Sequence, residues 1–241
     1  MILKVTTVYL QFFRAALKKK WSGSLLSVSD AQQINGRAKE YLHRLNKCGE
    51  VRRVYWGWYY VPERQGVWDF LGKDKGLKVV IKQTAASVWN YDFIHRDIYR
   101  LAVEDRSYKN ALENFAKEMG WIFEVEYHDK IPYEYRRVDD LFIEAPESCV
   151  VNCMSEWSFA DAFATLHFRK NEIDFDKLKR LGRWRRISKT DTRVWTAIKY
   201  GCKLLNDHLG KQIFKVRATG LKQGDVKELI EEATERVVEF A

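Results

Sequence analysis

The chain of 241 residues has few cysteines and no long apolar run. It has four cysteines, Cys48, Cys149, Cys153 and Cys202, which form neither a CxxC pair nor a disulfide framework. Reduced thiols and a cytoplasmic location are therefore expected. No segment approaches the roughly 18 apolar residues needed to span a membrane, and the first residues do not resemble a cleaved signal. We expect no membrane association.

The usual sequence signatures of enzymes are also missing. There is no P-loop, no GxGxxG and no GxSxG. His95-Arg96-Asp97 resembles a kinase catalytic loop, but Ala102 stands where a kinase has Asn. Cys149 and Cys153 have no second pair or nearby His at the spacing of zinc ligands. We therefore expect no metal, no cofactor and no catalytic activity.

Positive charge is concentrated near the N-terminus. Residues 1–64 hold 12 Lys and Arg against four Asp and Glu, a net charge of +8, whereas the whole chain carries +9. A basic part joined to a nearly neutral part indicates that one end binds a polyanion. A basic surface that is merely solvated is the alternative.

The spacing of residues 1–48 predicts a helix-turn-helix. Apolar residues recur at helical spacing over residues 5–20, at Val5, Val8/Tyr9, Phe12 and Ala15/Ala16. Ser29 and Gln32 match a capping box that opens a short helix. Asn35-Gly36 then supplies a turn before a longer helix over residues 37–48.

A β-hairpin is expected directly after the second helix. Residues 51–55 and 58–61 are rich in β-forming side chains and flank a turn at Trp56-Gly57. A hairpin at this position is the wing of a winged helix, and Tyr59 and Tyr60 are expected to pack it onto the first helix. The winged helix would cover residues 1–62.

The longer helix and the wing supply the expected DNA contacts. Arg is the side chain best matched to guanine in the major groove, and Lys suits phosphates. The predicted base-reading residues are Arg37, Lys39, His43 and Arg44, and the predicted phosphate contacts are Lys47, Arg52 and Arg53. The binding partner is double-stranded DNA, unless these residues form only a solvated basic face.

The same segment resembles a known family. Its pattern is Ser29-Asp30-Ala31-Gln32, Leu42-His43-Arg44-Leu45, Gly49-Glu50-Val51-Arg52-Arg53-Val54 and Gly57-Trp58-Tyr59-Tyr60. This pattern is similar to the N-terminal winged helix of AbiEi-type (abortive-infection, type IV) antitoxins and related archaeal regulators, over about a quarter of the chain. The resemblance implies a winged helix that represses its own operon and a C-terminal domain that takes part in neutralising a cognate toxin protein.

A polar, glycine-containing linker over residues 63–76 is expected to lead into a larger mixed α+β domain over residues 77–241. Strands are predicted over 77–81, 121–127 and 138–143, with extended chain over 213–216. Helices are predicted over 107–119, 155–168, 175–181, 190–209 and 226–240. The last helix has an apolar stripe that docks on its own domain or, alternatively, forms a homodimer.

A second basic stretch lies in this larger domain. It contains Arg183, Arg185, Arg186, Lys189 and Arg193, with Trp184 and Trp195 interleaved along the wider stretch. Two helices joined here, the second capped by Ser188, would make another phosphate-binding surface. A solvated face paired with carboxylates is the alternative.

One group of carboxylates raises the question of an enzyme. Glu124, Glu126 and His128 alternate on one face of a predicted strand, and Asp139, Asp140 and Glu144 lie on or beside the next. Carboxylates on neighbouring strands can bind Mg²⁺ in a nuclease, but the Lys expected two residues after the second acid is absent. A solvent-facing strand surface paired with Arg136 and Arg137 is the simpler interpretation.

The sequence as a whole favours a DNA-binding transcriptional regulator, with a toxin-neutralising protein or a metal-dependent nucleic-acid enzyme as alternatives.

Overall fold

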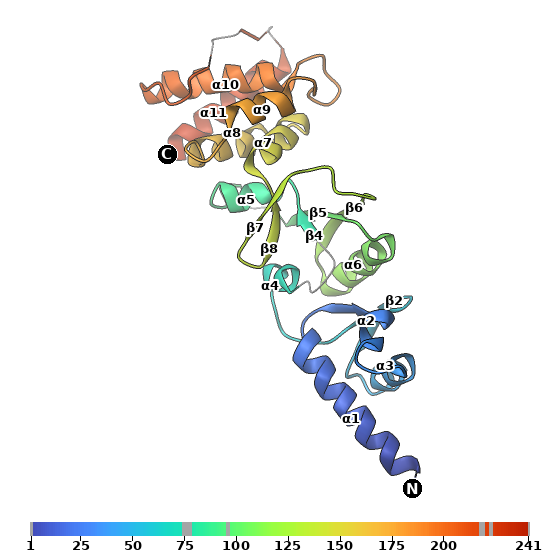
Figure 1. Cartoon of the computed structure of the whole chain (residues 1–241). Coiled ribbons are helices and arrows are strands. Elements are labelled where there is room, and N and C mark those ends of the chain that lie inside the picture. The colour runs from blue at the N-terminus through green and yellow to red at the C-terminus, as the bar shows by residue number, and fades with distance from the viewer. Residues whose placement is uncertain (1, 74–78, 95–96, 217–219, 222–223, 241) are drawn as a thin grey trace. The chain divides into compact units, whose positions relative to one another are not determined.

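The computed structural model describes residues 2–73, 79–94, 97–216, 220–221 and 224–240 (Figure 1). Within these residues the fold is mixed α+β, as predicted. The chain forms two compact units. Unit 1 comprises Met1–Val80, Asp97–Pro132 and Arg137–Phe142, and unit 2 comprises Ile81–Arg96, Tyr133–Arg136 and Ile143–Ala241.

Unit 1 begins with three helices and a small antiparallel sheet. The elements are α1 (Ile2–Trp21), β1 (Leu25–Ser27), α2 (Val28–Gln32), α3 (Ala38–Lys47), β2 (Arg52–Tyr55) and β3 (Trp58–Tyr60). The strands lie in the order β1-β3-β2, and Gly57, with φ +73°, makes the turn between β2 and β3. The predicted helices and the hairpin are therefore present, and the short strand β1 is an addition.

The capping box of α2 lies two residues earlier than predicted. Ser27 is extended and accepts a hydrogen bond from the backbone N–H of Asp30, whose carboxylate accepts from the Ser27 N–H at 2.8 Å. Ser29 lies within the first turn instead. The Ser29–Gln32 assignment was wrong because β1 ends at Ser27 and leaves that residue at the helix entrance.

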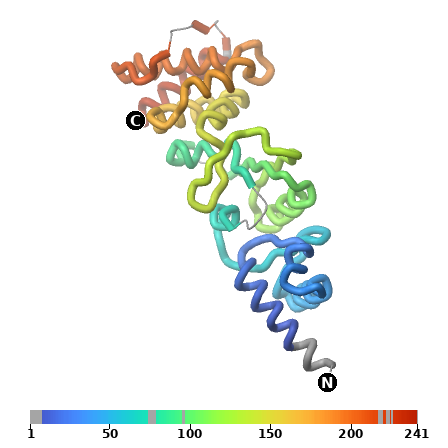
Figure 2. Tube along the Cα trace, in the orientation of Figure 1, coloured from blue at the N-terminus to red at the C-terminus, as the bar shows by residue number. Residues whose placement is uncertain are grey.

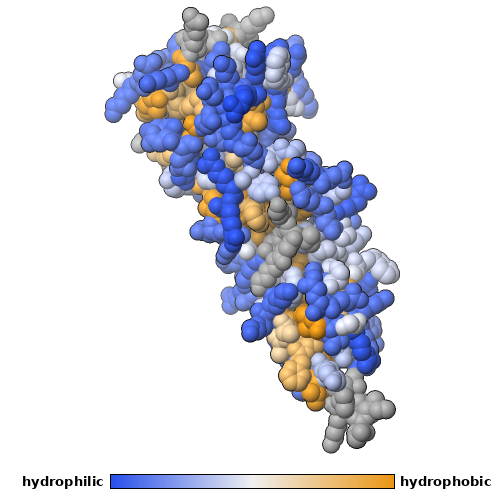
Figure 3. All heavy atoms as spheres, in the orientation of Figure 1, coloured by the Kyte–Doolittle hydropathy of each residue, from blue (hydrophilic) through white to orange (hydrophobic). Residues whose placement is uncertain are grey.

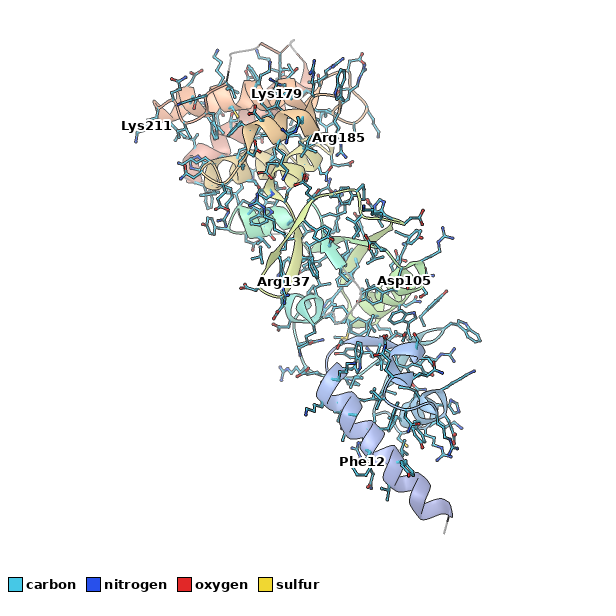
Figure 4. All side chains as sticks on the ribbon, viewed as in Figure 1. Phe12, Asp105, Arg137, Lys179, Arg185 and Lys211 are labelled. Atoms are coloured by element: carbon cyan, nitrogen blue, oxygen red, sulfur yellow. The ribbon has the colours of Figure 1, made fainter. Side chains whose placement is uncertain are left out.

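The predicted apolar stripe of α1 is on the wrong side of the helix. Phe13, Leu17 and Trp21 are buried against α3 and β3, whereas Phe12 is 70% exposed and lies on the opposite face (Figure 4). Hydrophobic surface gathers beside the N-terminal end of this helix (Figure 3). α1 is apolar on two faces, so periodicity alone did not decide which face enters the core.

The rest of unit 1 contains a parallel strand–helix–strand motif. β5 (Ile98–Val103) runs parallel to β6 (Ile122–Tyr127), in register from Ile98↔Ile122 to Val103↔Tyr127, and α6 (Arg106–Met119) connects them. Asp105 caps α6 by accepting a hydrogen bond from the Tyr108 N–H, and Gly120 ends it with a positive φ. The predicted helix and the strand at 121–127 are confirmed, while β5 escaped prediction.

Residues predicted as linker contain a short helix. α4 (Val67–Gly72) buries Phe70 and Leu71, and the Phe70 ring lies 4.7 Å from that of Phe115 on α6. Positions 74–76 of the predicted linker lie outside the described residues. The boundary over residues 63–76 stays a prediction.

The larger sheet has the order β6-β5-β4-β8-β7. β4 (Val79–Ile81) covers the described part of the strand predicted at 77–81. The single strand predicted at 138–143 is wrong, because the segment contains the turn between β7 (Tyr135–Val138) and β8 (Leu141–Glu144). Asp139 adopts φ 52°, a left-handed conformation that interrupts an extended strand.

Unit 2 is mainly helical, and its C-terminal helices are coloured yellow to red in Figure 2. Its helices are α5 (Ala85–Trp89), α7 (Pro146–Ser155), α8 (Phe159–Phe168), α9 (Phe175–Gly182), α10 (Val194–Leu209) and α11 (Asp225–Phe240). The helices predicted at 175–181 and 226–240 are confirmed. α11 buries Ile230, Ala233 and Val237 against its own unit, as the stripe predicted.

In unit 2 the sequence does not predict one helix and misplaces the start of another. α7 gives no signal because nearly every residue in it is buried, which removes the amphipathic pattern that marks a surface helix. α10 begins at Val194, and Ser188 does not cap it, since Arg193 occupies the N-cap position. Residues 213–216 belong to no described helix or strand, and their extended conformation stays a prediction.

Candidate nucleic-acid interface

α3 turns one face to the core and the opposite face to solvent. Its buried residues are Ala38, Tyr41, Leu42 and Leu45. The five predicted DNA-contacting residues in and beside this helix are all on the surface: Arg37, Lys39, His43, Arg44 and Lys47. Because the buried residues recur every three or four positions, the polar residues share the remaining arc of the helix. These five residues and Glu40 define the α3 surface.

Glu40 forms ion pairs with both arginines of the α3 surface. The Arg37 guanidinium lies 2.6 Å from one carboxylate oxygen of Glu40, and the Arg44 guanidinium lies 2.8 Å from the other. All three side chains are well exposed. Exposed pairs of this kind contribute about 0.2–1 kcal/mol, so either arginine can be released at small cost.

The other basic residues of the α3 surface lack acidic partners. Lys39, His43 and Lys47 are exposed, lie one turn apart and form no ion pair with any described residue. They form a continuous row along the helix that is available to a phosphate backbone.

Arg53 lies on the hairpin beside α3. Its backbone N–H donates a hydrogen bond of 2.9 Å to the side-chain carbonyl of Asn46, which fixes the start of the hairpin to the end of the helix. Its guanidinium stacks 4.7 Å from the centre of the Trp56 ring and has no acidic partner among the described residues. Trp56 is 81% exposed at the hairpin tip. Arg53 is therefore presented to solvent next to the α3 surface.

Arg52 faces a different neighbour. Its guanidinium lies 2.9 Å from the carboxylate of Glu118 on α6 and stacks on the rings of Tyr60 and Phe115. A phosphate contact by Arg52 would require this ion pair to open. Its predicted role in binding DNA stays a prediction, and the structure gives it a role in joining the hairpin to α6.

The sequence did not reveal that α6 supports the hairpin. The Tyr60 ring lies 4.4 Å from that of Phe115, and the side-chain amide of Asn110 donates a hydrogen bond to the Tyr55 hydroxyl at 3.3 Å. Tyr59 points the other way, into the core with Phe13. The expectation that both Tyr59 and Tyr60 pack on the first helix is right for Tyr59 and wrong for Tyr60. Adjacent residues of a strand face opposite sides, which was the available signal.

The second basic stretch lies in unit 2 and is exposed. Its predicted residues Arg183, Arg185, Arg186, Lys189 and Arg193 are all on the surface (Arg185 is labelled in Figure 4). Residues 177–199 hold nine Lys and Arg against a single Asp, a net charge of +8. A backbone bridge between Arg186 and Arg193 closes residues 186–193, which include Lys189, into a loop.

Two arginines of this stretch stack on an exposed tryptophan. Trp184 is 72% exposed, and the guanidiniums of Arg183 and Arg193 stack 4.9 and 5.5 Å from its ring centre. Neither arginine, nor Lys189, pairs with an acid among the described residues. Arg183, Trp184 and Arg193 define the Trp184 surface.

Other basic residues of the stretch are already engaged. Arg186 pairs with Asp191, and Arg185 donates a hydrogen bond to the side chain of Asn152. Burial alone would lower the pKa of Lys177, but hydrogen bonds and charge interactions with Glu134 and Glu147 outweigh it, so its pKa is raised. These three residues stabilise unit 2 and contribute less free charge than the sequence suggested.

The carboxylates considered for a nuclease do not lie on neighbouring strands. Two strands, β5 and β4, separate β6, which carries Glu124 and Glu126, from β8. Glu124 pairs with Arg100 at 2.8 Å. Glu144 is fully buried, and Asp139 and Asp140 lie in the β7–β8 turn. Across the described residues, no group of three or more His, Cys, Asp or Glu side chains is placed to hold a metal ion.

The simpler interpretation of this strand surface holds in part. Arg137 pairs with Asp140 at 3.2 Å, as expected for a solvent-facing pair. Arg136 instead lies 3.6 Å from the buried carboxylate of Glu147, in unit 2.

Comparisons with known proteins give no further guidance. No protein family, no curated protein and no solved structure matches this chain. None of the described helices is both long enough and apolar enough to cross a membrane.

Proposed function

We propose that this protein is a DNA-binding transcriptional regulator, in which residues 1–62 act as a winged helix. The observation that carries the proposal is the element order α1-β1-α2-α3-β2-β3 with basic, exposed residues on α3. In a helix-turn-helix the second helix enters the major groove and its side chains meet the base edges. The net charge of +8 over residues 1–64 supports the same interpretation.

Base readout is assigned to the arginines at the two ends of α3, Arg37 at its N-cap and Arg44 in its last turn. Arg37 and Arg44 exchange Glu40 for guanine or phosphate, because a bidentate contact with guanine discriminates by about 1–3 kcal/mol and exceeds the strength of an exposed ion pair. Lys39 and His43 lie on the same surface and reach bases or phosphates without leaving a partner. Glu40 keeps the arginines ordered when DNA is absent.

Phosphate contacts come from the end of α3 and from the hairpin. Lys47 ends α3 and Arg53 lies on the first strand of the hairpin, which Asn46 ties to the helix. Both have no acidic partner among the described residues, so neither has to leave an ion pair to meet a phosphate. Arg52 contributes only after its pair with Glu118 opens.

The Trp184 surface is a second candidate for binding phosphate, separate from the α3 surface. Two guanidiniums that have no acidic partner among the described residues lie beside one indole ring and support this role, because charge-assisted hydrogen bonds to phosphate are strong. Its contribution would be independent of base sequence. The antitoxin role, a toxin partner and a homodimer through α11 stay predictions from the sequence.

The test is DNA binding by the full chain across a salt titration. We expect tight binding to DNA from its own upstream region at salt concentrations where random duplex dissociates. The double variant Lys39→Glu/Lys47→Glu should lower affinity for both DNAs. It should also reduce the salt dependence by about one unit of slope for each phosphate that the variant no longer neutralises. Lys203→Glu, an exposed lysine on α10, is the matched control.

Three outcomes would contradict the proposal in different ways. Equal affinity for the two DNAs would mean non-specific binding. Unchanged affinity in the Lys39→Glu/Lys47→Glu variant would remove the α3 surface as the site. Loss of binding on Arg183→Glu/Arg193→Glu, with the α3 variant unaffected, would move the site to the Trp184 surface.

A further inference from the structure

A cavity of about 560 Å³ lies in unit 1. Its walls come from the end of α1, from β1 and α2, from the tip of the β2–β3 hairpin and from the start of α6. This volume is within the range of small-molecule sites. None of its lining residues belongs to the α3 surface.

Aromatic side chains make much of the wall. Trp58 and Tyr108 are buried, with ring centres 5.0 Å apart, and Trp56 projects from the hairpin tip. Trp21 also lines the cavity, and its indole N–H is buried without a hydrogen-bond partner among the described residues. Indole and phenol rings present negative faces that attract cations.

The charged residues that line the cavity are both acidic, Asp30 and Asp105. In a chain with a net charge of +9, a cavity lined by two carboxylates and no Lys, Arg or His differs in sign from the protein as a whole. Asp105 lies at the start of α6 (Figure 4).

Each carboxylate is held in place through one oxygen. Oδ2 of Asp30 accepts from the N–H and hydroxyl of Ser27, at 2.8 and 2.7 Å. Oδ1 of Asp105 accepts from the Tyr108 N–H at 2.8 Å and the Ser107 hydroxyl at 2.7 Å. The second oxygen of each carboxylate accepts no hydrogen bond from the described residues. The cavity therefore has two oriented acceptors and an aromatic wall.

We infer that this cavity binds a small organic cation with a flat apolar body, such as an aromatic amidine. The carboxylates would accept its N–H groups, and the rings of Trp56, Trp58 and Tyr108 would cover its body. Two of the lining tryptophans already stack with cations, since Arg53 lies over Trp56 at 4.7 Å and Lys20 over Trp21 at 5.4 Å. Neither cation lines the cavity.

The position of the cavity would allow a bound ligand to influence DNA binding. α2 precedes α3 by a short turn, and the hairpin is tied to α3 by Asn46, so a ligand that touches α2 and the hairpin acts on the elements that hold α3. Coupling of this kind is reciprocal, so DNA would change the affinity for the cation by the same factor. This step rests on the proposed function, whereas the binding site itself does not.

The first experiment measures binding without DNA. The full chain carrying ¹⁵N-labelled tryptophan is titrated with benzamidine and, separately, with its neutral isostere benzamide, while the indole N–H signals are followed by NMR. We expect benzamidine to shift the signals of Trp56 and Trp58 but not that of Trp184 in unit 2. Benzamide should bind more weakly, by a factor of about ten or greater, because it lacks the charge.

Variants locate the site. Asp30→Asn/Asp105→Asn keeps a side-chain oxygen for each helix cap but removes both charges, and should weaken benzamidine binding about tenfold. Asp176→Asn/Asp207→Asn, two exposed carboxylates outside the cavity, should leave it unchanged. Equal binding of both probes, binding of neither, or no effect of Asp30→Asn/Asp105→Asn would overturn the inference.

A second arm adds DNA. Saturating benzamidine should change the affinity for DNA from the upstream region. If benzamidine binds in the cavity and DNA affinity does not change, the coupling is refuted and the site stands. If the protein binds no DNA at all, the proposed function fails while the NMR result still decides the site.

Discussion

Trp58 of the hairpin donates its indole N–H to the hydroxyl of Ser107, at 3.2 Å, at the start of α6. This contact joins the predicted wing to a helix that follows it by about 50 residues in the chain. The hairpin is thus held between the core of the first three helices and α6, on opposite faces of β3.

The hydrogen bond between Trp58 and Ser107 should contribute measurably to the free energy of unfolding. Trp58→Phe keeps an aromatic ring but removes the donor, and should lower the free energy of unfolding by about 1–2 kcal/mol, from the missing hydrogen bond and a smaller ring. Trp184→Phe, at an exposed position, should change it by less than about 0.5 kcal/mol. Urea unfolding of the two variants measures the difference, and equal midpoints would show that the Trp58–Ser107 bond is unimportant.

Glu40→Gln should increase DNA affinity. The carboxylate pairs with Arg37 and Arg44 in the free protein, so its loss releases two guanidiniums and removes one negative charge from the α3 surface. We expect a gain of about threefold to tenfold at low salt, which shrinks as salt screens the charges. Fluorescence anisotropy with labelled duplex measures it. Weaker binding than wild type would instead mean that Glu40 itself contacts DNA.

Ser27 and Ser29 distinguish the two positions considered for the capping box. Ser27→Ala removes the side chain that accepts from the Asp30 N–H and should cost about 1 kcal/mol of stability. Ser29→Ala removes an exposed hydroxyl that only bonds Ser27, at 2.6 Å, and should cost less than about 0.5 kcal/mol. Thermal unfolding of both variants is the measurement, and a larger effect at Ser29 would favour the assignment made from the sequence.

Gly201 on α10 allows α8 to approach closely. A Cβ at this position would collide with the ring of Phe163, which is fully buried. Gly201→Ala should therefore destabilise the protein by about 1–3 kcal/mol, although alanine favours helix formation. Gly36→Ala provides the control, because a Cβ there meets no atom within 4 Å. A neutral Gly201→Ala variant, by calorimetry, would mean that the two helices separate easily.

His167 makes stability depend on pH in the acidic range. Burial, and secondarily the charge of Lys170, lowers the pKa of His167 from 6.5. The folded state therefore binds this proton less tightly than the unfolded chain. Its stabilising contribution is present above pH 6.5 and is lost as the pH falls through the lower pKa of the folded state.

Unfolding measured between pH 7 and pH 5 tests this expectation. His167→Asn should lose less stability than wild type over this interval, and Lys170→Gln should reduce the loss in part. A parallel decline in all three proteins would exclude His167 as the group responsible.

Local elements with a strong hydrophobic period or a clear boundary could be predicted from the sequence. The helix that ends at Gly120 and the hairpin around Gly57 could be predicted, because their apolar spacing and glycine positions fit only one type of secondary structure. The exposed basic residues of α3 were predictable for the same reason, since the buried stripe of the helix leaves them on the other side.

Features that depend on residues far apart in the chain became visible only in the folded structure. α7 gave no signal because it is buried on nearly all sides, and α1, apolar on two faces, did not reveal which face is buried. The pairing of Arg52 with Glu118 and the cavity shared by Asp30 and Asp105 join residues more than 60 positions apart. The periodicity of apolar residues indicates only which residues are buried. Which side chains meet is decided by packing, through burial and hydrogen bonds that no local pattern contains.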